Sequence, residues 1–252
     1  MGVLKYVNNK LIATVIVIIV AMVGFIGVNL SIVQETMNTN KGVKKILIDS
    51  GHGGMDGGTS SKNGTLEKNI NLSIANKLKV SLQKAGYEVV MTRTEDVGLY
   101  STSGTIRERY IEDLKKRCDL KKSSNCDMLI SIHLNYFTQS KYYGAQVWYS
   151  SYIDSSTLAA TIQKNLKGDL DPENKRVQKA AKNSYRILRD NDIMPSVIVE
   201  CGFLSNYEEE QKLKSDDYQE KIAGSISKSV GEFYKTNSEA KTVRWISFSA
   251  RQ

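Results

Sequence analysis

Apolar runs alternate with amphipathic stretches along most of this chain. Three runs, at residues 45–49, 128–133 and 197–200, are rich in isoleucine, leucine and valine and lead into a histidine or a glutamate. Predominantly apolar runs of this length are typical of strands that are buried on both faces of a parallel sheet. Further strands are predicted at residues 87–92, 145–149 and 185–188.

The amphipathic stretches between these runs predict helices. In residues 65–85, apolar side chains recur at four-residue spacing: Leu66, Ile70, Ile74, Leu78 and Leu82. Thr65 is expected to cap the start of this helix and Gly86 to end it. Further helices are predicted at residues 105–117, 154–166 and 218–234. The alternation predicts a single α/β domain over residues 45–235, with a twisted, mostly parallel sheet flanked by helices, and a polar tail at 236–252.

The N-terminal part has a different composition from the rest. Residues 11–28 are almost continuously apolar, which is long enough to span a bilayer and longer than the core of an ordinary signal peptide. Residues 1–33 are therefore predicted to be an uncleaved membrane anchor, with a cleaved signal segment as the alternative, and 34–44 a polar tether. Lys5 and Lys10 precede the apolar run and favour a cytoplasmic N-terminus, which places the folded domain in an extracytoplasmic location.

The net charge of +8 adds one candidate surface, a basic cluster formed by Lys115, Lys116, Arg117, Lys121 and Lys122. A solvated basic surface is the simpler interpretation, and attraction to an anionic wall polymer is the other. The cluster lacks interleaved aromatic side chains, and the chain has no zinc-finger or RNA-binding signature, so nucleic acid is not expected as a partner.

The three cysteines leave one question open. Cys118 and Cys126 flank a short polar segment and either form a disulfide in an oxidising compartment or remain free thiols. Cys201 directly follows Glu200, and neighbours in a strand face opposite sides of the sheet. Cys201 is therefore predicted to be a buried filler.

The candidate chemistry lies at the ends of the three apolar runs. His52 and His133 are the only histidines of the chain, and Glu200 ends the third run. Parallel strands bring their carboxyl ends to one edge of a sheet, so these side chains are expected to share a site. A hydrolytic zinc ion usually has three protein ligands of the His and carboxylate type. Glu67, at the start of a predicted helix, and Asp56, in the glycine-rich loop before it, both remain candidates for the third ligand.

Each of these residues has a structural interpretation when taken alone. A histidine at a strand end commonly makes structural hydrogen bonds, and Glu67 suits a helix start because the helix dipole favours an acid there. Glu200 is harder to explain in this way, because a buried carboxylate without a partner is costly. The combination favours a metal site in which Glu200 remains available for acid–base chemistry. The hypothesis requires the two imidazoles to lie within about 10 Å of each other, since each zinc–nitrogen bond is only about 2.0–2.1 Å long.

These segments resemble the zinc-dependent N-acetylmuramoyl-L-alanine amidases of bacterial cell walls, the amidase-3 type. The matching segments are IDSGHGGMDGG around His52, LEKNINL around Glu67, Met91 to Arg93 with Asp96, residues 114–117, SIHLN around His133, and PSVIVECGFLSN around Glu200. The resemblance extends over residues 45–234. Two parts depart from the family pattern, namely the lysines and cysteines of residues 118–126 and the tail after Thr236, which has no assignable role.

The resemblance implies a six-stranded α/β domain that binds one Zn²⁺. It implies His52, Glu67 and His133 as ligands, which selects Glu67 over Asp56, and Glu200 as the catalytic carboxylate. The implied reaction is hydrolysis of the amide between the lactyl group of N-acetylmuramic acid and L-alanine of the peptidoglycan stem peptide.

The layout of the chain, an anchor plus one catalytic domain, is similar to the germination-specific amidases of spore-forming bacteria. Those enzymes act on spore-cortex peptidoglycan and are needed to make muramic δ-lactam. We find no long inserted helix of the kind that blocks the site in division-associated members. We therefore hypothesise that a separate regulatory protein docks on the exposed face.

Three other functions remain as alternatives. A zinc peptidase that cuts within the stem peptide would need the same ligands. A wall-binding module without catalysis would not need Glu200. A Cys–His hydrolase would pair Cys201 with His133, although an activated thiolate normally lies at a helix N-terminus or beside an imidazole.

Overall fold

The strands form one six-stranded sheet with the order β2-β1-β3-β6-β4-β5. The computed structural model describes residues 42–101 and 103–249, with side chains up to residue 239. The strands are β1 (Lys45–Ser50), β2 (Glu88–Met91), β3 (Met128–Asn135), β4 (Gln146–Tyr149), β5 (Lys179–Ala180) and β6 (Ser196–Phe203). Strands β2, β1, β3 and β6 run parallel, whereas β4 is antiparallel to β6. The prediction of a mostly parallel α/β sheet is confirmed.

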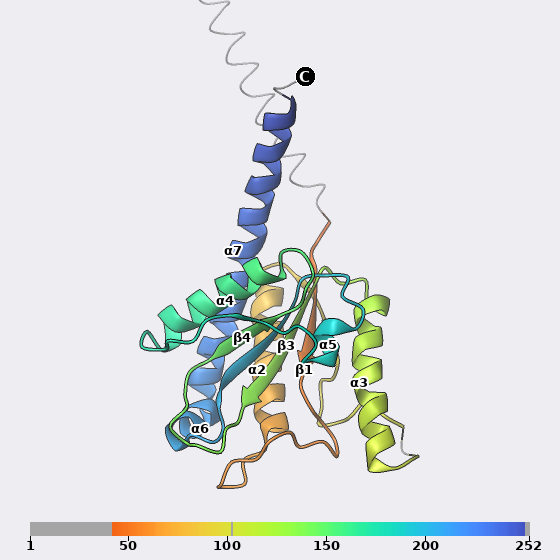
Figure 1. Ribbon diagram of the computed structural model, residues 1–252, viewed down its shortest axis with the longest axis vertical. Helices are drawn as coiled ribbons and strands as arrows, with labels where there is room; N and C mark the ends of the chain where they lie inside the picture. Colours follow the sequence, from red (N-terminus) through yellow and green to blue (C-terminus); the bar gives the residue numbers. More distant parts are fainter. Residues whose placement is uncertain (1–41, 102, 250–252) are drawn as a thin grey trace, which may run out of the picture. The chain divides into compact units, whose positions relative to one another are not determined.

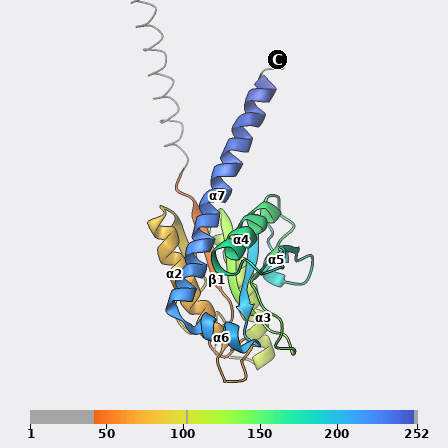
Figure 2. The same cartoon turned by 90° about the vertical axis from the view of Figure 1, so that its left-hand side faces the viewer.

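Helices cover both faces of this sheet (Figures 1 and 2). They are α2 (Glu67–Lys84), α3 (Ile106–Ser123), α4 (Ser155–Leu170), α5 (Arg186–Arg189), α6 (Tyr207–Lys214) and α7 (Asp216–Ser249). The larger apolar cluster joins one face of the sheet to α2, α4 and α7, and the smaller one joins the opposite face to α3 and α5.

The two clusters reveal which way each strand residue points. Along β3, Ile130 and Ile132 belong to the larger cluster, and Leu129 belongs to the smaller one. Since side chains alternate along a strand, His133 projects from the face that α3 and α5 cover. By the same alternation, Glu200 projects from this face of β6, because Val199 and Cys201 both belong to the larger cluster. The two residues therefore share one face and one edge of the sheet.

The ends of helix α2 test two local predictions. Gly86 follows the helix with φ of +88°, a left-handed conformation that glycine adopts without strain, so its predicted role is confirmed. The prediction that Thr65 caps the helix is wrong. Leu66 occupies the N-cap position without a side-chain bond, and the Thr65 hydroxyl instead donates to Glu210 Oε1 at 2.6 Å. A contact with distant α6 has replaced the local one.

Several elements differ from their prediction for identifiable reasons. Residues 185–188 were predicted as a strand but contribute to helix α5, because a run with so few apolar residues has no distinguishable period. Strand β5 was not predicted, since it has two exposed residues and forms only by pairing with β4. Helix α6 was not predicted either, because its sequence is largely polar. Helix α7 continues to Ser249, well beyond residue 234, so the segment expected to be a tail is largely helical.

The predicted membrane anchor lies outside the described residues, as does most of the tether. Within the part of the chain that is described, no helix combines the length and apolar character that crossing a bilayer requires.

The basic cluster predicted at residues 115–122 is not one surface. Arg117 and Lys121 are 3% and 0% exposed, and Lys121 Nζ donates to the carbonyl oxygens of Ile187 and Asp190 at 2.9 and 3.0 Å. Only the remaining lysines of the cluster are exposed to solvent. The cysteines near this helix, Cys118 and Cys126, are free thiols in the structure.

Candidate metal centre

His52 lies at the carboxyl edge of the sheet, two residues beyond the end of strand β1. His52 has φ of +62°, which is unusual for a residue with a side chain. Arg117 Nη2 donates to the His52 carbonyl oxygen at 2.7 Å and holds this conformation in place. Gly51, which precedes His52, packs against the ring of His133 so closely that a Cβ atom would overlap it. The glycine at this position thus allows the two strand ends to approach each other.

Glu67 reaches the same point from the opposite face of the sheet. It is the first residue of α2, where the helix dipole favours an anion, and it is 3% exposed. Its Oε2 accepts a hydrogen bond from the backbone N–H of Thr59 at 2.9 Å, and its Oε1 accepts one from the N–H of Leu134 at 3.0 Å. Asn71 Nδ2, one turn along the helix, also donates to Oε1 at 3.2 Å. These bonds hold the carboxylate in one orientation.

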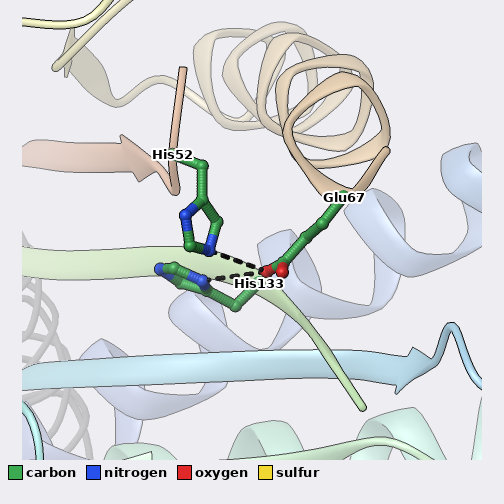
Figure 3. A group of neighbouring side chains, drawn as sticks. All are labelled: His52, Glu67 and His133. Carbon is green, nitrogen blue, oxygen red and sulfur yellow. Dashed lines mark hydrogen bonds and ion pairs between the residues drawn. The ribbon is translucent and has the colours of Figure 1, made fainter. Parts of the chain in front are cut away.

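His52, Glu67 and His133 converge on one small volume (Figure 3). His52 Nε2 and His133 Nδ1 lie 3.3 and 3.1 Å from Glu67 Oε1. The ring centroids of the two histidines are 4.9 Å apart, which meets the distance requirement that the metal hypothesis set. One potential ligand atom from each of the three residues lies within 4.8 Å of the others.

The spacing and chemistry of these atoms suit a zinc ion. Bonds of about 2.0–2.1 Å at tetrahedral angles place two ligand atoms roughly 3.3 Å apart. Both nitrogen–oxygen separations are close to this value. Two imidazoles and one carboxylate are also a donor set that hydrolytic zinc commonly uses.

Asp56 contacts His52 from the side away from Glu67. Its Oδ2 lies 2.7 Å from His52 Nδ1, and its Oδ1 accepts a hydrogen bond from the N–H of Gly58 at 3.0 Å. This contact fixes the imidazole so that Nε2 points toward Glu67. Asp56, the competing oxygen candidate, is thus in position to orient a histidine, whereas Glu67 lies among the converging atoms.

The pKa directions indicate that this group of side chains favours positive charge. Burial alone would lower the pKa of His52, but hydrogen bonds with Asp56 and Glu67 outweigh burial and raise it to about 10. Burial would raise the pKa of Glu67, but the two histidines outweigh it and hold this pKa well below its usual value. A bound cation would satisfy the same carboxylate in place of the protons.

Glu200 lies beside this group on the neighbouring strand. It is the register partner of His133 in the parallel pairing of β3 and β6. The residue is 7% exposed, and its Oε2 is buried without a hydrogen-bond partner among the described residues. Burial is the main cause that raises the pKa of Glu200 to about 7. A carboxyl group with such a pKa can take up and release a proton near neutral pH.

A buried polar layer beneath the candidate ligands was not predicted. Asp49 Oδ1 accepts a hydrogen bond from Arg117 Nη1 at 2.6 Å, and Asp49 Oδ2 accepts one from Ser131 Oγ at 2.6 Å. Arg93 joins this layer by donating to the carbonyl oxygens of Ser50 and Gly51 at 3.0 and 2.9 Å. The signal was present in the sequence, because Asp49 and Ser131 interrupt runs that are otherwise apolar.

Comparison with known proteins gives a family for this arrangement. The family model described as N-acetylmuramoyl-L-alanine amidase matches residues 46–232, from strand β1 into helix α7. The matched range includes all three converging residues and Glu200.

Individual relatives agree with this match. The germination-specific N-acetylmuramoyl-L-alanine amidase of Bacillus subtilis is 37% identical over 195 residues, which cover 76% of this chain and 80% of the relative. The solved CwlD amidase of Clostridioides difficile, in complex with the GerS lipoprotein, is similar with a TM-score of 0.74 at 42% identity, over 77% of this chain and 99% of that chain. An N-acetylmuramoyl-L-alanine amidase of Clostridium difficile 630 is similar with a TM-score of 0.65 at 33% identity, over 77% of this chain and 97% of that chain.

Proposed function

The chain belongs to the N-acetylmuramoyl-L-alanine amidase family, and from this premise we propose that it works with one zinc ion held by His52, Glu67 and His133 and with Glu200 as the catalytic carboxylate. The reaction is hydrolysis of the amide that links N-acetylmuramic acid to L-alanine in peptidoglycan. The single observation that carries the proposal is the convergence of two imidazoles and a carboxylate within 4.8 Å, with an unpaired buried carboxyl group on the adjacent strand.

Other parts of the chain orient the three proposed ligands. Asp56 orients His52, backbone N–H groups orient Glu67, and Gly51 packs against His133. A zinc ion bound there would act as a Lewis acid toward the scissile carbonyl and make water more acidic.

Glu200 carries the proton transfers in this proposal. Its unpaired Oε2 takes a proton from the attacking water as the C–O bond to the lactyl carbonyl carbon forms. The same oxygen then returns that proton to the alanine nitrogen as the C–N bond breaks. The products are a lactyl carboxylate on the sugar and a stem peptide with a free amino end. A pKa of about 7 suits both steps, because the group must accept and donate in one cycle.

The proposal is tested by metal analysis together with product analysis. Purified full-length protein should contain about one zinc per chain, and mass spectrometry of digested peptidoglycan should show complete stem peptides with a free alanine amino group. Peptides shortened at their amino end would instead identify a peptidase that cuts within the stem. A protein that binds glycan but releases nothing would be a wall-binding module.

We further propose that the substrate is spore-cortex peptidoglycan. The support is the similarity to the germination-specific amidase of Bacillus subtilis. Removal of the stem peptide frees the lactyl carboxylate, which is the group that muramic δ-lactam formation has to use. Deletion of the gene in a spore-former should remove muramic δ-lactam from the cortex, and a variant lacking Glu200 should fail to restore it.

The proposed location is extracytoplasmic, at the spore envelope or cortex, with residues 1–33 as a membrane anchor. The substrate lies outside the cytoplasmic membrane, and the apolar run at residues 11–28 has the length of a span. We also propose a regulatory protein partner, because the similar CwlD amidase was solved in complex with a lipoprotein. Full activity of the purified chain, with no protein recovered alongside it from spore extract, would argue against the partner.

A further inference from the structure

Arg176 is a half-buried cation that is held in place without a carboxylate. It lies between α4 and β5, and its Nε donates to the carbonyl oxygen of Tyr143 at 2.8 Å. Its guanidinium carbon lies 4.3 Å from the centroid of the Phe203 ring, a cation–π contact. Among the described residues, no carboxylate forms an ion pair with Arg176, and its Nη2 makes no hydrogen bond.

The two other arginines near the site use their N–H groups in ion pairs and hydrogen bonds within the protein. Arg117 forms ion pairs with Asp49 and Asp113. Arg93 donates to four backbone carbonyl groups from its three nitrogens. Arg176 differs from both, because Nη2 of its planar guanidinium group makes no hydrogen bond among the described residues.

Arg176 is connected to the strand that carries the proposed catalytic carboxylate through Gln146. Arg176 Nη1 donates to Gln146 Oε1 at 3.3 Å, and Gln146 is the register partner of Glu200 in the antiparallel pairing of β4 and β6. Paired residues project from the same face of a sheet, so the Gln146 and Glu200 side chains are neighbours. Phe203, beneath the guanidinium, lies three residues beyond Glu200 on the same strand.

The carboxylate whose charge acts most strongly on Arg176, that of Glu209, already accepts other hydrogen bonds. Glu209 accepts hydrogen bonds from the backbone N–H groups of Gly144 and Phe203 at 2.8–3.1 Å. Its charge acts on Arg176 only at longer range. The Arg176 fork is therefore oriented by a carbonyl, an amide and an aromatic ring, and its positive charge has no close counter-ion within the described chain.

We propose that Arg176 is a specificity-determining residue that binds a carboxylate of the stem peptide on the departing side of the scissile bond. The inference rests on the proposed function, which places that bond beside Glu200. The sugar side of the bond carries no carboxylate, whereas D-glutamate, which follows L-alanine in the stem, has a free α-carboxylate. A guanidinium fork binds a carboxylate through two parallel hydrogen bonds and orients it. Arg176 thereby favours a departing peptide that carries this negative charge over one in which the carboxylate is amidated.

The test compares two disaccharide-peptide substrates that differ only at this group, one with the free α-carboxylate of D-glutamate and one with that carboxylate amidated. The wild-type full-length protein should prefer the acid. Arg176→Gln should reduce kcat/KM for the acid by roughly 10- to 150-fold, which is the value of a charge-assisted hydrogen bond, and should change it for the amide by less than about threefold. Arg176→Lys, which keeps the charge but not the fork, should fall between these values.

Lys175→Gln removes the same charge from the exposed neighbouring residue and should leave the preference unchanged. The melting temperature and zinc content of each variant show whether the Tyr143 segment and the metal centre remain intact. Equal losses of kcat/KM on both substrates would overturn the inference and indicate that Arg176 has only a structural role. An equal wild-type rate on acid and amide would overturn it as well. If the wild type releases no stem peptide from either substrate, the proposed function itself fails, and this inference fails with it.

Discussion

His133 and Glu200 are paired residues in the register of the two central strands, β3 and β6. Because paired residues project from the same face, an imidazole that converges with His52 and Glu67 lies beside a carboxyl group whose Oε2 has no hydrogen-bond partner among the described residues. In the proposed mechanism the imidazole binds the ion and the carboxyl group transfers a proton. The predictions below follow from this division.

Glu200→Gln should abolish turnover and leave metal binding intact. The amide has nearly the same shape but cannot accept a proton, and general acid–base catalysis is worth about 10²- to 10⁴-fold in rate. The measurement is kcat together with zinc content per chain. His52→Ala is the matched comparison and should lose both. Normal hydrolysis by the Gln variant would remove Glu200 from the mechanism.

The same substitution should stabilise the metal-free protein at alkaline pH. Burial raises the Glu200 pKa from 4.5 to about 7 in the folded state, so the folded protein holds this proton more tightly than the unfolded chain. The bound proton contributes up to roughly 3 kcal/mol to the free energy of unfolding. This contribution is complete below about pH 4.5 and is lost as the pH rises through about 7. Urea unfolding should therefore show that Glu200→Gln is the more stable form at pH 8 and that the difference disappears near pH 4.5. A constant difference across this range would contradict the raised pKa.

Asp56→Asn should weaken zinc binding without removing a ligand. Asp56 holds His52 through Nδ1 at 2.7 Å, and loss of such a partner typically costs about 10- to 100-fold in metal affinity. Competition with a chromogenic chelator gives the affinity. Asp119→Asn, an exposed aspartate on α3, serves as control and should bind zinc like the wild type.

Arg117→Gln should destabilise the fold and disturb the His52 loop. The guanidinium is 3% exposed, pairs with Asp49 and Asp113, and donates to the carbonyl of His52. Its removal leaves two buried carboxylates without their partner, so the free energy of unfolding should fall by about 3–5 kcal/mol. The exposed neighbour Lys115 provides the control, and Lys115→Gln should change stability by less than about 0.5 kcal/mol. Equal effects of the two substitutions would place Arg117 outside the core.

A metal chelator should stop hydrolysis, whereas iodoacetamide should not. Cys201 is 1% exposed, and burial raises the pKa of its thiol, so alkylation requires unfolding. Cys126 is half-buried and precedes the start of β3, at the opposite end of that strand from His133, so its modification should leave turnover unchanged. Inactivation by iodoacetamide that is prevented by substrate would revive the Cys–His alternative.

The predictable features follow local rules of the chain. An apolar run sets a buried strand, four-residue spacing sets a helix face, and Gly86 supplies the left-handed residue that ends α2. Alternation along β6 was enough to predict that Cys201 turns into the core, away from Glu200. The gathering of His52, His133 and Glu200 at one edge follows from the parallel direction of β1, β3 and β6.

Other features depend on contacts between residues far apart in the chain, which no local pattern encodes. A lysine or arginine on a helix is ordinarily solvated, and only the packing of α3 against the sheet and α5 places Arg117 and Lys121 in the interior. The Thr65 hydroxyl could cap its own helix, but α6 presents Glu210 to it.

The sequence by itself determined the buried strands, the longer amphipathic helices and the few side chains able to carry the chemistry, because these depend on short-range periodicity and on residue type. The residue pattern left Asp56 and Glu67 open as the third ligand, and the tertiary structure places Asp56 against His52 and Glu67 beside both histidines. It also set β4 antiparallel, which pairs Gln146 with Glu200 and places the Gln146 side chain where Arg176 Nη1 donates to it. These relationships are fixed by the close packing of distant segments, in which each polar group takes the partner that the fold brings within reach.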